Sequence, residues 1–192
     1  MFKFIQQTIG LGVVIIIGLY LYGNFDEKTK PNQDIEISYP KSESDFVNIT
    51  KSYIKKTNDA KNDLQIAALK SDRNKQICKK FNGDFKVNNW VGKVVKLGSS
   101  SSGKGSIDIE LSKNIKIGTW SNDFSDGRYS TLIDQETTLF NKALGLNKGD
   151  LVRFSGTFIK DTDECIREKS VTQNGGMTEP EFIFRFSDIS KI

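Results

Sequence analysis

The chain has no histidine, only two cysteines and only three prolines in 192 residues. Without histidine it lacks the usual general base near neutral pH, the commonest zinc ligand and a histidine ligand for haem. Two cysteines are too few for a thiolate metal cluster, although they suffice for one disulfide in an oxidising compartment. We therefore expect no catalytic site, no metal site and no cofactor. A hydrophobic content of 36% supports a folded core.

Positive charge is concentrated in the N-terminal part of the chain. Residues 1–83 hold 13 Lys and Arg against 9 Asp and Glu, whereas residues 84–192 hold 15 of each. The C-terminal part therefore has no net electrostatic attraction for a polyanion. This makes nucleic acid an unfavourable partner for that part.

Residues 4–22 form a run of 19 residues without a charged side chain. A helix of that length rises roughly 28 Å, about the thickness of a bilayer's hydrocarbon core. Tyr20, Tyr22 and Phe25 follow at its end, as interfacial aromatic residues do. We expect residues 1–25 to be an uncleaved transmembrane signal anchor. A cleaved signal peptide is the alternative, although no A-x-A-like site follows the run.

The short N-terminal tail carries the α-amino group and Lys3, which favours a cytoplasmic N-terminus. The expected location is therefore the inner membrane, with one span and an extracytoplasmic, periplasmic C-terminal domain. Residues 26–43 are polar and contain two prolines, which predicts an extended linker after the span.

A helical period of apolar residues runs through residues 44–82. Ser44 or Asp45 is the expected first cap, and Ser71 begins a second possible cap where two helices would meet. The stripe either packs on the domain that follows or binds a partner, including a second copy. The sequence leaves this choice and the oligomeric state open.

From Phe85 the apolar period changes from 3.6 to 2, which indicates strands. Gly92 lies in the middle of the first strand, where we expect a bulge or bend. One helical segment, capped by Asp134, interrupts the strands. The expected strands are 85–97, 106–112, 115–120, 151–159 and 181–189, with the helix at 135–146.

This order of elements, the mid-strand glycines and the stretch "KGDLVRFSG" resemble the OB-fold superfamily over residues 84–192. The expected fold class is α+β: a transmembrane helix, a helical spacer, and a five-stranded OB-fold-like Greek-key β-barrel with a helix between strands 3 and 4. The resemblance implies a ligand-binding face on strands 2 and 3. In this chain that region holds Lys104, Asp108, Glu110, Lys116, Trp120, Asn122 and Asp123.

In an OB barrel the strands near Cys78 and Cys165 are neighbours. A Cys78–Cys165 disulfide is therefore reasonable, and two unrelated thiols are the alternative.

The stretch "GSSSSGKG" at 98–105 matches the start of a phosphate-binding loop but lacks the final Ser or Thr. Because a period-2 segment follows it rather than a helix, we expect a hairpin tip. Asp123, Asp126 and Asp134 carry oxygen ligands that suit calcium, but their spacing matches no EF-hand, and we expect turn and cap roles instead.

The segment 161–180 is long for a connection and contains Asn174-Gly175, a hairpin signal. We expect a β-arm here. Its charged residues Glu164, Arg167, Glu168 and Lys169 form either a partner surface or a solvated face.

These features favour a membrane-anchored, non-catalytic OB-fold binding protein with a protein partner, as part of an envelope assembly. The alternative is a nucleic-acid-binding OB domain at the cytoplasmic membrane surface. The layout is similar to that of the haem chaperone of cytochrome c maturation. That family attaches haem through histidine, which this chain lacks.

Overall fold

The computed structural model describes residues 37–192, and the expected membrane anchor lies outside these residues. Residues Ser38–Ile192 form one compact unit. Within residues 37–192 no helix has the length and apolar character needed to cross a bilayer. The elements are α2 (Lys41–Asn58), α3 (Asp63–Phe81), β1 (Lys86–Ser99), β2 (Gly105–Ser112), β3 (Ile115–Gly118), α4 (Asp123–Asp126), α5 (Thr138–Leu144), β4 (Leu151–Phe158), β5 (Lys160–Asp161), β6 (Cys165–Ile166), α6 (Gln173–Thr178) and β7 (Glu181–Lys191).

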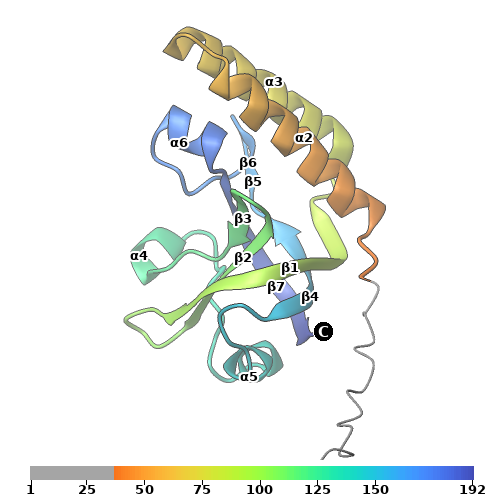
Figure 1. Cartoon of the computed structure of the whole chain (residues 1–192). Coiled ribbons are helices and arrows are strands. Elements are labelled where there is room, and N and C mark those ends of the chain that lie inside the picture. The colour runs from red at the N-terminus through yellow and green to blue at the C-terminus, as the bar shows by residue number, and fades with distance from the viewer. Residues whose placement is uncertain (1–36) are drawn as a thin grey trace, which may run out of the picture. The chain divides into compact units, whose positions relative to one another are not determined.

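Five strands hydrogen-bond in a closed ring in the order β1-β2-β3-β7-β4 (Figure 1). The β3–β7 pair is parallel and the other pairs are antiparallel. The α+β class and the five strands with α5 between β3 and β4 agree with the sequence analysis. The strand β1 is long because it pairs with β4 through its first half and with β2 through its second half.

The expected irregularity in β1 occurs on both sides of Gly92 rather than at it. Register shifts lie between Val87 and Trp90 and between Val94 and Lys96. At Gly92 a Cβ atom would lie 2.4 Å from the Ile109 side chain. Glycine is needed there because β2 approaches too closely for any side chain.

Aromatic side chains fill one end of the ring. The Phe158 ring lies 5.1 Å from those of Phe46 and Phe184 and 5.7 Å from that of Trp90. These four side chains are at most 1% exposed. Phe46 comes from α2, so the helical stripe packs on the ring and shares its core. The stripe therefore packs on the domain that follows, as one of the two interpretations expects.

The helices α2 and α3 lie side by side (Figure 1), but they meet at residues 59–62, not at Ser71. Asn62 caps α3 by accepting a hydrogen bond from Gln65 N–H at 3.0 Å. The "SDRN" segment continues the helix because Arg73 turns inward and is fully buried. The helix α2 begins at Lys41 after Pro40, before the expected caps.

The segment "GSSSSGKG" is the tip between β1 and β2, as expected. Thr137, rather than Asp134, caps α5 through a 3.1 Å hydrogen bond from Phe140 N–H. Asp134 instead forms an ion pair with Lys104 at 2.8 Å.

The long connection between β4 and β7, residues 159–180, is named the arm. Its hairpin lies at β5–β6, and the prediction of a hairpin at Asn174-Gly175 was wrong. Those two residues lie in α6, whose first turn is capped by Thr172 through Gly175 N–H at 3.1 Å. The backbone of Arg167 accepts a hydrogen bond from Ile183 N–H, so the arm extends the sheet beyond the end of β4. Ile183 is fully buried.

Candidate functional site

The expected binding face carries a row of alternating charges across four strands. Register places Lys93 opposite Glu110, Glu110 opposite Lys116, and Lys116 opposite Glu181. Lys116 Nζ lies 3.0 Å from Glu181, and Lys93 Nζ lies 3.8 Å from Glu110. The hydrogen bond to Glu181 raises the pKa of Lys116. Opposite charges facing each other on one sheet surface stabilise the sheet.

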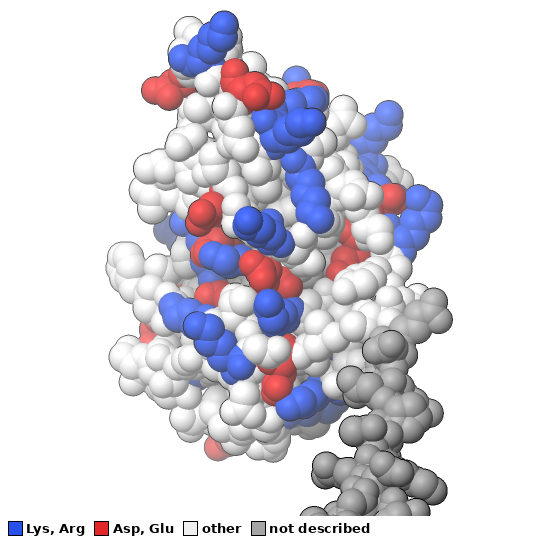
Figure 2. All heavy atoms as spheres, in the orientation of Figure 1, with Lys and Arg blue, Asp and Glu red and all other residues white. Residues whose placement is uncertain are grey.

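A second charge pair on this face involves the arm. Lys169 Nζ forms an ion pair with Asp108 Oδ1, and both side chains are mostly buried. Gly118 lies opposite Asp108 on β3, where a Cβ atom would be 2.0 Å from Asp108 Oδ1. The absent side chain leaves room for the carboxylate. Figure 2 shows blue and red side chains interleaved over the visible face, without a large area of one sign.

The hairpin tip forms a separate hydrogen-bonded cluster. The Asp123 carboxylate accepts hydrogen bonds from the hydroxyls of Ser100, Ser101 and Ser102, and from Ser102 N–H. The Ser102 and Ser101 hydroxyls hold the pKa of Asp123 well below its usual range. Asn122 caps α4 through Ser125 N–H at 2.9 Å. Within residues 37–192 no group of His, Cys, Asp or Glu side chains could hold a metal ion.

Trp120 is half-buried and packs beside Tyr129, which limits the stacking surface that single-strand binding needs. Its ring lies 6.1 Å from Tyr129, and the Arg167 guanidinium lies 5.0 Å from the centre of Tyr129. In the described part of the chain Trp120 Nε1 is buried without a hydrogen-bond partner.

The structure therefore does not gather the seven expected residues into one site. Asp108, Glu110 and Lys116 share the β2–β3 face, while Asn122 and Asp123 belong to the hairpin-tip cluster. Lys104 and Trp120 have the separate partners given above. Each of the five charged residues forms an ion pair or accepts several hydrogen bonds within the domain.

No protein-family model matches the chain, and a search of curated proteins also finds no match. Any function must therefore be inferred from the residues and their geometry.

A groove of about 630 Å³ lies between α3 and the β5–β6 hairpin. The sequence analysis did not predict it, because its walls come from segments that are distant in the sequence. The residues lining it are Ala67, Lys70, Ser71, Asn74, Lys75 and Cys78 on one side, and Lys160, Asp161, Thr162, Asp163, Glu164 and Cys165 on the other.

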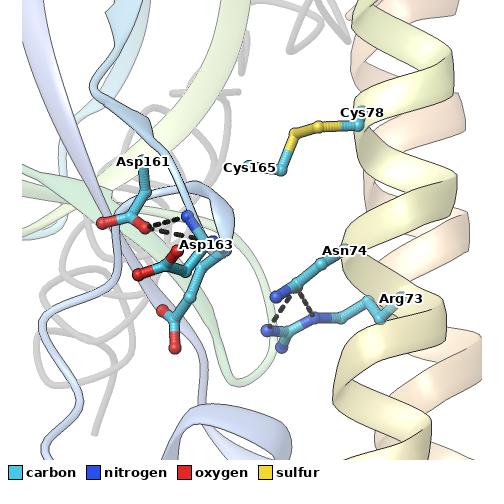
Figure 3. The surroundings of a disulfide bond; sticks show 7 residues. Arg73, Asn74, Cys78, Asp161, Asp163 and Cys165 are labelled. Carbon is cyan, nitrogen blue, oxygen red and sulfur yellow. Dashed lines mark hydrogen bonds between the residues drawn. A yellow bond between two sulfur atoms is a disulfide. The ribbon is translucent and has the colours of Figure 1, made fainter.

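The Cys78–Cys165 disulfide joins the two walls of this groove (Figure 3). This is the pair considered from the sequence, and the two residues are 87 positions apart. Cys78 is exposed near the end of α3, whereas Cys165 is only 6% exposed. Cys165 also has φ = +71°, in the left-handed region that residues other than glycine rarely adopt.

The turn beside Cys165 is held by a carboxylate. Asp161 Oδ1 accepts hydrogen bonds from the backbone N–H groups of Asp163 and Glu164, at 2.9 and 3.0 Å. Burial alone would raise the pKa of Asp161. These N–H groups and the nearby Arg167 outweigh burial and lower that pKa.

A buried ion pair connects the next part of the arm to α3. Arg73 pairs with Glu168, and their side chains are 1% and 2% exposed. Arg73 Nη1 also donates to the backbone oxygen of Gly176 in α6 at 2.8 Å. Burial raises the pKa of Glu168 although Arg73 opposes this effect. Glu168 is therefore an internal group, neither solvated nor part of an exposed partner surface.

A second buried carboxyl fixes the start of α2 to the ring. Glu43 is 1% exposed, and its Oε2 accepts a hydrogen bond from Val91 N–H at 2.9 Å. The neighbouring Ser42 hydroxyl accepts from Trp90 Nε1, also at 2.9 Å. Burial raises the pKa of Glu43 to about 7, and the Val91 hydrogen bond and Arg153 offset only part of this. From the sequence, Glu43 was expected to be the last residue of the polar linker 26–43, and no motif distinguished it from a solvent-exposed residue; it lies instead in the first turn of α2.

Proposed function

We propose that this protein is a non-catalytic OB-fold binding module, held at a membrane by residues 4–22 and exposed on the extracytoplasmic side. The strand order β1-β2-β3-β7-β4, with α5 between β3 and β4, is the observation that carries the proposal. A five-stranded Greek-key ring of this kind is characteristic of the OB-fold. The Cys78–Cys165 disulfide supports an oxidising compartment.

The proposed ligand is a protein partner within an envelope assembly. The lysines of the β2–β3 face are already paired with carboxylates. The surface of this protein that contacts the partner would therefore use mainly uncharged polar and apolar side chains. Each phosphate contact by such a lysine would first have to break an ion pair. A protein surface can bind without breaking these pairs, so we favour it over nucleic acid.

A topology experiment tests the proposal directly. A reporter that is active only outside the cytoplasm is fused after Ile192, and the same fusion lacking residues 1–25 is the control. We expect activity from the full chain and none from the control. An inactive full-length fusion with a reduced Cys78 and Cys165 would instead favour the cytoplasmic, nucleic-acid-binding alternative.

The partner test uses the full-length protein in mild detergent. We expect chemical crosslinking in cells to capture a membrane or envelope protein. Binding of single-stranded DNA or RNA by the purified protein, in preference to a protein partner, would contradict the proposal.

A further inference from the structure

The two cysteines of the disulfide differ in their exposure to solvent. Both cysteines line the groove, but Cys78 is exposed near the end of α3, whereas Cys165, in β6, is only 6% exposed. Thiol–disulfide exchange requires a thiolate to reach one of the two sulfurs. The groove gives a small thiolate access to Cys78, and the burial of Cys165 protects its sulfur from the same attack.

Lysines on both walls of the groove favour the approach of an anion. Lys75 and Lys160 are exposed, and no ion pair of either is found among residues 37–192. Lys70 is paired with Glu164, and the charge of Asp161 is compensated by an ion pair with Arg167. Asp163 is the remaining carboxylate on this side. Beside the disulfide, the lysines without an ion pair therefore outnumber the carboxylates without one.

We propose that the Cys78–Cys165 bond is a thiol-exchange site that a small external thiol can open in the folded protein. The thiolate attacks Cys78 Sγ, a mixed disulfide forms on Cys78, and Cys165 leaves as a thiolate that takes up a proton from water. A second thiol molecule then attacks the sulfur of the external thiol and releases Cys78. Two external thiols are oxidised to one disulfide, and the protein disulfide is reduced by two electrons.

Opening the bond would loosen only one part of the arm. Residues 160–166 are tied to α3 by the disulfide and the Lys70–Glu164 pair. The following part is held independently, by the buried Arg73–Glu168 pair and by the hydrogen bond from Arg73 to Gly176. Cys165 has a strained, left-handed backbone conformation in the closed state. Opening the disulfide lets this residue relax, and the relief of strain favours the opened state. The site would thus change the width of the groove and leave the ring intact. This inference does not depend on the proposed function.

The test uses oxidised full-length protein and glutathione as the probe thiol, without denaturant. Acid quenching at short times, alkylation and peptide mass spectrometry locate the glutathione adduct. We expect the adduct on Cys78 to exceed that on Cys165 by at least about tenfold, as access controls which sulfur is attacked. Reduction that occurs only in denaturant, or an adduct mainly on Cys165, would overturn the proposal.

Hydrogen exchange of the reduced protein provides the second measurement. The amides of residues 163–166 should exchange at least about tenfold faster after reduction, because local opening costs less free energy. The amides of α6 should keep their protection, since Arg73 still holds that segment. A loss of protection throughout α6 and the ring would show a purely structural disulfide and refute the inference. A Cys78→Ser/Cys165→Ser variant should reproduce the exchange pattern of the reduced protein.

Discussion

Replacing Glu43 by glutamine should stabilise the protein above neutral pH. The pKa of Glu43 is raised from 4.5 to about 7 in the folded state, so folding favours the protonated carboxyl. Its contribution to stability is fully present below pH 4.5 and is lost as the pH rises through 7. The difference of about 2.5 pH units corresponds to about 3 kcal/mol, at 1.36 kcal/mol for each unit.

In Glu43→Gln the side-chain oxygen can still accept the hydrogen bond from Val91 N–H, and no charge develops at high pH. Urea unfolding of the full-length protein, followed through tryptophan fluorescence, should give unfolding free energies for the variant and the wild type that differ by less than about 1 kcal/mol at pH 5. At pH 8 the variant should be more stable by up to about 3 kcal/mol.

The exposed Glu136→Gln exchange is the matched control, and its effect should not change between pH 5 and pH 8. Glu168 remains in both proteins, so its own raised pKa does not contribute to the difference. If wild type and Glu43→Gln differ by the same amount at both pH values, Glu43 does not titrate in this range and the reasoning fails.

Two further changes test the packing of the arm and of the ring. Arg73→Met leaves the Glu168 carboxylate buried without its counterion, which should destabilise the protein by about 3–5 kcal/mol in urea unfolding. Lys142→Met removes an exposed ion pair and should have little effect. Gly156→Ala places a Cβ atom 2.2 Å from the backbone oxygen of residue 185, and the resulting overpacking should cost about 1–3 kcal/mol or more. At Gly145 the nearest atom would be 3.6 Å away, so Gly145→Ala should be almost neutral. A stable Arg73→Met protein, or equal effects at the two glycines, would contradict these accounts.

The strands and their order could be predicted because their signal is local. Alternation places Ile107, Ile109 and Phe182 inside, and each is at most 1% exposed.

The break between α2 and α3 was misplaced because "SDRN" carries good capping residues. A buried salt bridge to Glu168, 95 residues away, turns Arg73 inward and keeps the helix continuous. No local pattern contains that information.

The pairing of charges on the candidate binding face could not be predicted for the same reason. Asp108 and Lys116 are polar residues at outward positions of strands, which is how ligand-binding residues also appear. Their partners Lys169 and Glu181 lie 61 and 65 residues later in the chain. Only the closed topology shows that these charges neutralise one another. Glu43 was missed because its burial depends on the distant strand β1.

The position of β7 has a consequence for how the protein is made. This final strand inserts between β3 and β4, which precede it in the chain. Until β7 has emerged from the ribosome, β3 and β4 each have one unpaired edge that can pair with another chain. We conclude that the ring can close only after β7 has left the ribosome, and that rapid synthesis up to this strand limits mispairing of the nascent chain.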